Sequence, residues 1–276
     1  MINPGWDMLK VLLIAAIGVG LGRCCSRGGR TALCLGYCLP LAALILLTLG
    51  RCGIFGAPSG WLGGVFFGQP RFLVLSLVIP AGLMTLLPFL PRRAERIAVG
   101  LVLVGFIACF SIYPVLAPAL IRDGLLRTPN HTDPLGVCLQ TRPYTCGPAA
   151  AVSALHELGL QGHEGRIAAW ASSAPVIGTL PWDLCNALDR QYGPQGLRCE
   201  FRRFETLDEL KSAGLTLVMV RGGTLTNHCV AVLAINDRQV ILADPSLGKV
   251  RMPVEQFAAE WRHTGITLRR DGASGI

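Results

Sequence analysis

The chain has 276 residues, of which 51% are hydrophobic, a mean hydropathy of +0.50 and a formal net charge of +8. This hydropathy is too high for an ordinary soluble protein, and the length suits two modest domains. Because basic residues are divided between the apolar half and the rest of the chain, anionic lipid headgroups explain the charge better than nucleic acid does. We therefore expect a lipid bilayer and no nucleic acid among its partners.

The long apolar runs lie in the first part of the chain and predict a transmembrane region over residues 1–121. A helix that crosses a bilayer needs roughly 20 apolar residues. The first run, Val11 to Gly22, is long enough only if Met8 and Leu9 join it, and a signal peptide is the alternative. Asp7 and the lack of an Ala-x-Ala cleavage pattern argue against that alternative. The four expected helices are 8–22, 31–50, 72–90 and 97–121.

The connections between these runs predict the orientation of the chain. The stretch from Arg51 to Arg71 is rich in glycine and aromatic residues, so we expect it to lie in the membrane interface. Short cytoplasmic loops collect basic residues. Arginines mark the first and third connections, which therefore face the cytoplasm: Arg23, Arg27, Arg30, Arg92, Arg93 and Arg96. This pattern predicts a bacterial inner-membrane protein whose second half faces the extracytoplasmic side.

The eleven cysteines divide between the two halves. Six belong to the apolar half, where cysteine acts as a small hydrophobe: Cys24, Cys25, Cys34, Cys38, Cys52 and Cys109. In the second half no spacing matches a zinc site, so we expect no metal and no cofactor. A disulfide stays open among Cys138, Cys185, Cys199 and Cys229.

A polar linker over residues 122–134 leads to a folded domain over residues 135–276. Apolar periodicity and end signals predict helices over 146–159, 164–171 and 181–192, followed by a short helix ending near Gly214. Thr179 is the expected N-cap of the third helix, and Thr206 and Glu209 form a capping-box pattern for the fourth. Strands are predicted at 215–220, 229–235, 240–243 and 266–269. Helices first and antiparallel strands second indicate an α+β domain.

The candidate nucleophile is Cys146, which Gly147 and Pro148 follow at the expected start of a helix. A helix N-terminus and a nearby imidazole both lower the pKa of a thiol. Among the five histidines, His228 is the best partner because it begins a predicted strand. Asp244 ends the next strand, and antiparallel pairing brings these two ends together. A base oriented by a carboxylate is what nucleophilic catalysis requires.

Each of these residues also has an ordinary structural interpretation. A lone cysteine is more often buried in a core, and Asp244 before Pro245 is a common turn initiator. His228 could be satisfied by backbone at a strand edge. Gln140, six residues before Cys146, indicates nothing by itself. Only the set of residues favours a catalytic site.

Residues from about 137 to 270 resemble the bacteriocin-processing peptidases, a family of papain-like cysteine peptidases that remove double-glycine leader peptides. The motifs that carry the resemblance are Gln140 before Cys146-Gly147, then Asn227-His228-Cys229-Val230-Ala231-Val232, and then Ala243-Asp244-Pro245-Ser246-Leu247-Gly248. Phe257, Trp261 and Gly265 agree with the closing pattern of the family.

The resemblance implies a papain-like fold and a role for each motif residue. Cys146 would be the nucleophile, His228 the general base, Asp244 the group that orients the imidazole, and Gln140 the oxyanion donor. The chain departs from the family in two respects. No Gly-x-x-x-x-Gly-Lys-Ser/Thr phosphate loop occurs in the sequence, so ATP-driven export is not expected. The peptidase domain also follows the spans, whereas in the family it normally precedes them.

We therefore predict a multi-pass membrane cysteine peptidase that cleaves a peptide or protein substrate at the membrane. Two alternatives remain open at this point. The same fold and thiol could transfer an acyl group to an amine. The domain could also be a non-catalytic, membrane-anchored peptide-binding module. In that case the Gly18-x-x-x-Gly22 pattern would suit packing against a membrane partner protein.

Overall fold

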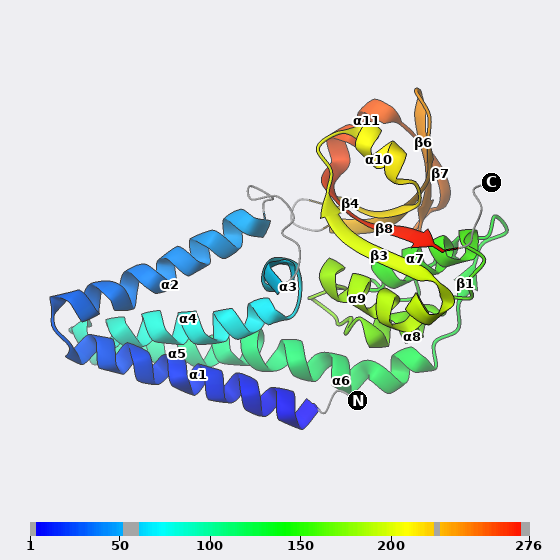
Figure 1. Ribbon diagram of the computed structural model, residues 1–276. Helices are drawn as coiled ribbons and strands as arrows, with labels where there is room; N and C mark the ends of the chain where they lie inside the picture. Colours follow the sequence, from blue (N-terminus) through cyan, green and yellow to red (C-terminus); the bar gives the residue numbers. More distant parts are fainter. Residues whose placement is uncertain (1–3, 52–60, 224–226, 272–276) are drawn as a thin grey trace. The chain divides into compact units, whose positions relative to one another are not determined.

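The structure is a computed structural model that describes residues 4–51, 61–223 and 227–271 (Figure 1). The chain forms two compact units. The first comprises Met1–Phe55 and Gly64–Leu120, and the second comprises Gly56–Gly63 and Ile121–Ile276.

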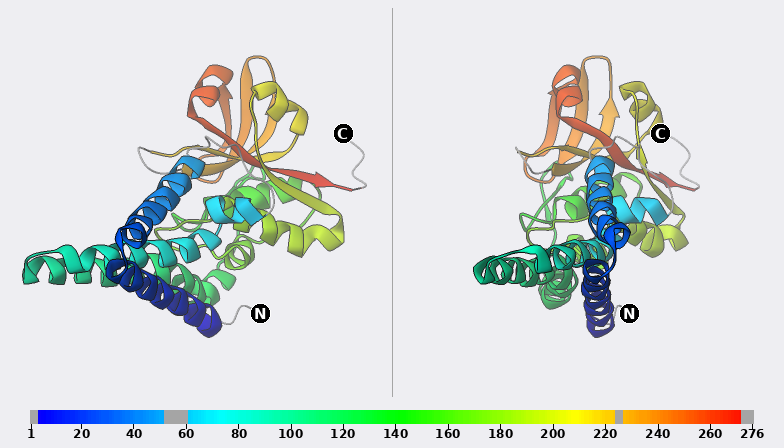
Figure 2. Two further views of the ribbon diagram at one scale, coloured as in Figure 1. Left: turned by 60° about the vertical axis from the view of Figure 1, so that its left-hand side comes forward. Right: turned by 90° about the vertical axis from the view of Figure 1, so that its left-hand side faces the viewer.

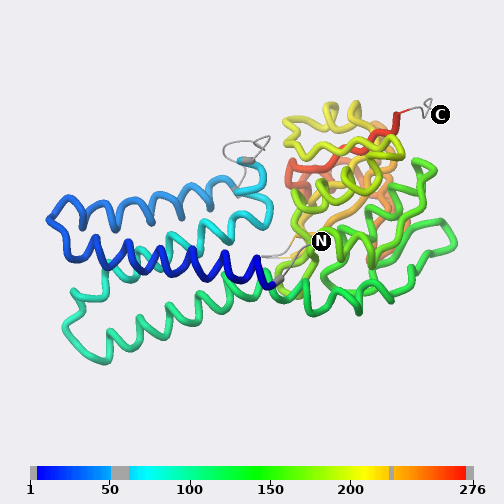
Figure 3. Tube along the Cα trace, turned by 60° about the horizontal axis from the view of Figure 1, so that its bottom comes forward, coloured from blue at the N-terminus to red at the C-terminus, as the bar shows by residue number. Residues whose placement is uncertain are grey.

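The first unit is helical, and its long segments stand out as rods in Figure 3. Four of its helical segments are long and apolar enough to cross a membrane, as the sequence predicts. The first runs from Gly5 to Arg27, so this helix has the length that a membrane crossing needs and is longer than the apolar run in the sequence. The elements are α1 (Pro4–Arg27), α2 (Arg30–Arg51), α4 (Pro70–Leu86) with the turn η1 (Leu87–Phe89), and α5 (Arg93–Phe106) with the π-helix η2 (Ile107–Ile112) and α6 (Tyr113–Leu126).

Two connections differ from the sequence prediction. The expected interfacial loop after Arg51 contains a helix, α3 (Trp61–Phe67), because paired glycines mask its pattern. The preceding residues 52–60, including Cys52, lie outside the described part of the chain. Helix α6 continues to Leu126, so the first residues of the expected linker 122–134 are helical.

Gly18 and Gly22 lie on α1 where it meets α4. A Cβ atom at Gly18 would collide with the carbonyl oxygen of Leu77, and one at Gly22 would collide with that of Ala81. Small residues at this spacing let two helix backbones approach closely. The pattern is therefore used within the chain to join α1 to α4. These two glycines are therefore not free to pack against a membrane partner protein, the role that would have suited the binding-module alternative.

The second unit is built on a six-stranded antiparallel sheet in the order β3-β8-β4-β5-β6-β7. Its strands are β3 (Leu197–Arg203), β4 (Thr216–Arg221), β5 (Asn227–Ile235), β6 (Gln239–Asp244), β7 (Gly248–Pro253) and β8 (Trp261–Arg270). A two-stranded ladder of β1 (His131–Thr132) and β2 (Cys138–Leu139) precedes the sheet. The predicted α+β papain-like class is confirmed.

Helices cover the sheet on both faces (Figures 1 and 2). Helices α7 (Cys146–Glu157), α8 (Glu164–Trp170) and α9 (Pro181–Tyr192) lie together on one side. Helices α10 (Leu207–Ala213) and α11 (Val254–Glu260) enclose the main apolar core on the other. Strand residues alternate between these faces, and the core takes Phe204, Val218, Val220, Val230, Val232, Leu242, Phe257 and Trp261.

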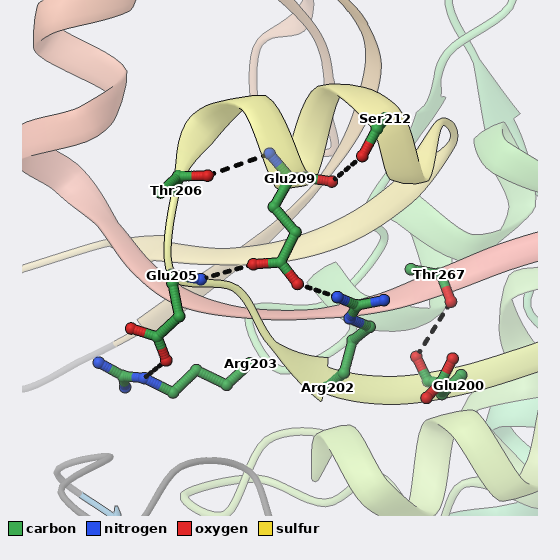
Figure 4. A network of polar contacts seen from close by, with 8 residues as sticks. All are labelled: Glu200, Arg202, Arg203, Glu205, Thr206, Glu209, Ser212 and Thr267. Carbon is green, nitrogen blue, oxygen red and sulfur yellow. Dashed lines mark hydrogen bonds and ion pairs between the residues drawn. The ribbon is translucent and has the colours of Figure 1, made fainter.

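Two elements of the sheet and one helix were missed from the sequence, and one cap was wrong. The missed elements are β3, β7 and α11, and the short ladder of β1 and β2 was also not predicted. Leu180 rather than Thr179 occupies the N-cap position of α9, because the Thr179 hydroxyl bonds the Tyr144 carbonyl instead. The Thr206 cap is confirmed: its hydroxyl accepts the Glu209 N–H at 3.2 Å (Figure 4).

Candidate active site

Cys146 is the first residue of α7, as the sequence predicts, and Thr145 occupies the N-cap position. Small buried residues follow it and let α7 lie in the centre of the second unit. Gly147 meets α9 closely, since a Cβ there would lie 3.1 Å from Leu184 and 3.4 Å from Thr179. The cysteine thiol therefore lies at the positive end of a helix whose position is fixed by packing.

His228 and Asp244 lie on neighbouring strands, at the start of β5 and the end of β6. The His228 Nε2 and Asp244 Oδ1 atoms are 2.8 Å apart, a hydrogen-bond distance. Both side chains are largely buried, with 19% and 13% of their surface exposed. The antiparallel pairing of β5 with β6 thus brings together two residues that are far apart in sequence.

The thiol and the imidazole shift each other's pKa. Burial would lower the pKa of His228, but its hydrogen bonds with Asp244 and Cys146 outweigh burial and raise that pKa to about 9. Burial would raise the pKa of Cys146, whereas its hydrogen bond with His228 and the N–H groups of Cys229 and Gly147 lower it. These opposite shifts favour a thiolate beside an imidazolium.

Asp244 completes the charge arrangement. Burial would raise the pKa of this carboxyl group, but the hydrogen bonds from His228 and from the Ser246 N–H hold it below its usual value. The Ser246 N–H donates to Oδ1 at 2.7 Å. Asp244 is therefore both a turn residue and the partner of the imidazole, so the two interpretations open in the sequence coexist.

Gln140 is tied to the turn that follows Asp244. Its backbone N–H donates to the Pro245 carbonyl at 2.8 Å, and its side-chain Oε1 accepts the Ser246 hydroxyl at 3.2 Å. Its Nε2 donates to the Arg142 carbonyl at 3.1 Å. An amide nitrogen carries two hydrogens, so a second donor remains on Nε2. The structure thus joins Gln140 to Asp244 through Ser246, a residue with no role in the sequence prediction.

The pKa values of the other four cysteines in the second unit shift in the direction opposite to that of Cys146. Burial raises the pKa of Cys138 and that of Cys185 to about 12, and it raises the pKa of Cys199 and of Cys229 well above the usual value. All four are free thiols. Within the described ranges, no group of three His, Cys, Asp or Glu side chains is arranged to hold a metal ion. Cys146 is therefore the thiol of this unit that is suited to reaction.

Glu164 is a second residue that the sequence did not indicate. It opens α8, it is fully buried, and its carboxylate accepts hydrogen bonds from the segment between Gln140 and Cys146. No motif marks it, because its partners lie 19 and 23 residues away in the chain.

Comparisons with solved structures find similar domains. The peptidase domain of Streptococcus ComA, a bi-functional ABC transporter involved in a quorum-sensing pathway, has 21% identity and a TM-score of 0.42 and covers 48% of this chain and 96% of that one. A double-glycine motif protease from an AMS/PCAT transporter, in complex with the leader peptide, has 18% identity and a TM-score of 0.42. This match covers 52% of this chain and 95% of that one.

Sequence comparisons identify the family. An uncharacterized protein of Methanothermobacter thermautotrophicus is 32% identical over 134 residues, which are 49% of this chain and 88% of the relative. A protein of Methanothermobacter marburgensis is 27% identical over 132 residues, 48% of this chain and 87% of the relative. The profile of the Peptidase C39 family matches residues 135–272. The predicted resemblance is confirmed, and the chain belongs to the Peptidase C39 family of cysteine-type peptidases.

Proposed function

We propose that Cys146, His228, Asp244 and Gln140 are the catalytic groups of a membrane-bound peptidase that cleaves a peptide or protein substrate. The observation that carries the proposal is the 2.8 Å hydrogen bond between His228 and Asp244, together with the opposite pKa shifts of His228 and Cys146. Burial opposes both shifts, so specific contacts cause them. Such an arrangement is typical of an activated nucleophile.

The proposed reaction begins with attack of the Cys146 thiolate on a substrate carbonyl carbon. Because Nε2 of His228 is bonded to Asp244, its other ring nitrogen exchanges the proton with Cys146. The imidazolium then protonates the leaving amine, and an acyl-enzyme thioester remains. His228 next takes a proton from water, which attacks the thioester and releases the acid and the thiolate. Asp244 keeps the imidazole oriented in both steps.

Two donors would stabilise the tetrahedral oxyanion. One is the remaining N–H of the Gln140 amide, which its bonds to Arg142 and Ser246 hold in one orientation. The other is the backbone N–H of Cys146, because the first N–H groups of a helix have no partner inside the helix. Loss of one such donor typically lowers the rate by about 100-fold or more.

Alkylation with iodoacetamide at about pH 6 tests the nucleophile, because an ordinary thiol with a pKa near 8.5 is protonated there. Peptide mass spectrometry should find the label at Cys146, whereas the buried Cys138 and Cys185 act as internal controls. Cys146→Ala should lose both this label and peptidase activity. The proposal fails if Cys146 reacts no faster than Cys138, or if the Cys146→Ala protein still cleaves peptides.

We further propose that the four apolar helical segments cross a bacterial inner membrane and hold the peptidase unit on its extracytoplasmic side. The length of the segments and the arginine-rich connections support this orientation. Alkaline phosphatase fused after Ile276 should be active in cells, because this enzyme folds only outside the cytoplasm. A green fluorescent protein fusion at the same position should be dark. The reverse result would place the peptidase unit in the cytoplasm.

A further inference from the structure

Glu164 is a buried carboxylate that takes no part in the proposed chemistry. It is 0% exposed and begins α8, where its backbone N–H donates to the Asn130 side chain at 2.8 Å. In the described part of the chain, no Lys, Arg or His forms an ion pair with it. Burial of a carboxyl group is unfavourable unless hydrogen-bond donors compensate it. The identity of those donors shows what the residue does.

Among the described residues, the donors to the Glu164 side chain all come from one short segment. Its Oε1 accepts the Thr141 N–H at 2.9 Å, the Thr141 hydroxyl at 3.1 Å and the Thr145 hydroxyl at 2.5 Å. Its Oε2 is buried and has no hydrogen-bond partner among the described residues. Glu164 therefore binds both ends of the segment 141–145 through one oxygen atom.

This segment connects the oxyanion donor to the nucleophile. It begins directly after Gln140 and ends directly before Cys146. Within it, the Thr145 N–H donates to the Arg142 carbonyl at 3.1 Å, and the Arg142 N–H donates to the Thr145 hydroxyl at 3.2 Å. The segment is thus a closed turn, and Glu164 holds it from the side of α8.

We propose that Glu164 is a positioning residue that sets the location of the Gln140 amide relative to the Cys146 thiol and N–H. The inference rests on the proposed function, because it assigns no reaction step to Glu164 itself. Without the carboxylate, the turn would lose both anchors at Thr141 and Thr145. A displacement of about 1 Å in an active site can lower the rate about 100-fold.

Two reactions of the Cys146 thiol can distinguish a positioning role of Glu164 from a purely structural role in folding. With p-nitrophenyl acetate, the Cys146 sulfur attacks the acetyl carbon, an oxyanion forms, p-nitrophenolate leaves, and water hydrolyses the acetyl thioester to acetate. With iodoacetamide, the sulfur displaces iodide and no oxyanion forms. Acylation therefore depends on the oxyanion donors, whereas alkylation depends on the thiolate alone. Both rates are measured on the full chain in detergent micelles, with Cys146→Ala as the background.

Glu164→Leu removes the acceptor and fills a similar volume. We expect the acylation rate per titrated thiol to fall at least about 10-fold, while the alkylation rate and its pH profile stay within about twofold. Glu164→Gln keeps one acceptor oxygen for the two threonines. It should retain acylation within about threefold of the wild-type rate, since a hydrogen bond to a neutral acceptor is weaker but present.

An equal fall in both rates would show that Glu164 is only structural, and no fall in acylation would show that the turn does not need it. Either result overturns the proposal. If Glu164→Leu does not fold, Thr141→Val removes a hydroxyl that donates to Oε1 and leaves the Arg142–Thr145 bonds of the turn in place, and it should lower acylation without lowering alkylation. A wild-type chain whose Cys146 undergoes neither reaction would instead refute the proposed function, and this role with it.

Discussion

Large apolar side chains face outward in the first unit and inward in the second. Leu101 and Leu120 are 69% and 73% exposed in the first unit, whereas Phe204 and Phe257 are fully buried in the second. The outward apolar side chains would suit the hydrocarbon of the proposed membrane, whereas the inward ones suit a globular domain that water surrounds. The mean hydropathy of the whole chain describes neither unit.

The cysteines show the same contrast at the level of single residues. In the first unit Cys24, Cys34, Cys38 and Cys109 are exposed on the helices, and in the second unit Cys138 and Cys229 are buried. Neither exposure nor burial makes these thiols nucleophilic. Cys146 differs because an imidazole and backbone N–H groups contact its sulfur. The reactivity of a thiol therefore depends on the groups that contact its sulfur. This difference between Cys146 and the other cysteines can be tested.

The largest effect on the rate of hydrolysis is expected when a cysteine of the second unit, and not one of the first unit, is replaced. Cys146→Ala should lower the rate of peptide or p-nitrophenyl ester hydrolysis by about 1,000-fold or more, because removal of a nucleophile abolishes the covalent route. Cys38→Ser in the first unit is the matched control and should leave the rate unchanged. An equal loss of activity in the Cys38→Ser protein would contradict the assignment of the reactive thiol to Cys146.

The next prediction concerns pH and the charge of His228. Its pKa is about 9 in the folded chain and near 6.5 in an unfolded one. A raised pKa stabilises the folded state fully below pH 6.5, and this contribution is lost as the pH rises through about 9. The difference in unfolding midpoint between the wild type and His228→Gln should therefore narrow between pH 6.5 and 9. A difference that is constant over this range would contradict the imidazolium assignment.

A smaller effect is expected at Ser246, which joins Gln140 to the Asp244 turn. Ser246→Ala removes the hydroxyl that fixes the Gln140 amide but keeps the N–H bond to Asp244. Because the amide can still donate to the oxyanion, we expect the acylation rate to fall by about three- to tenfold. The rate of iodoacetamide alkylation should not change. A parallel fall in alkylation would indicate that the whole turn has moved.

The smallest effect on catalysis is expected in the first unit. Gly18→Ala places a Cβ against the backbone of α4 and should cost about 1 to 3 kcal/mol of stability in that unit. Gly20→Ala is the matched control, because a Cβ there has no atom within 4 Å. Thermal denaturation in detergent measures the stability, and Cys146 alkylation should be equal in both variants. A slower alkylation in Gly18→Ala alone would show that the helical unit influences the thiol.

Periodic patterns and local motifs predicted much of this molecule. The four long apolar helices, helix α7 and strands β4 to β6 follow directly from them. Strand β3 was missed because Arg198, Glu200 and Arg202 break its apolar character on the edge of the sheet. At this edge one face of the strand meets water, so charge is tolerated there.

Long-range hydrogen bonds explain two further differences between the sequence prediction and the structure. Thr179 has the composition of an N-cap, but its hydroxyl bonds Tyr144, 35 residues away. Glu164 is an ordinary acidic residue at the start of a helix until the fold places it against Thr141 and Thr145. The family motifs named the proposed catalytic groups, whereas the contacts that hold those groups depend on tertiary structure. These supporting contacts could not be deduced from spacing.

The anchoring of α8 determines where the peptidase unit can be cut from the rest of the chain. Asn130 bonds the Glu164 N–H and the Gly162 carbonyl, and a side chain at Gly165 would collide with the Leu125 carbonyl. A fragment that starts at residue 135, where the family profile begins, loses all of these contacts. The contacts that hold α8 therefore extend beyond the part of the chain that the family profile matches. A fragment that is to retain all of these contacts should begin at or before Leu125.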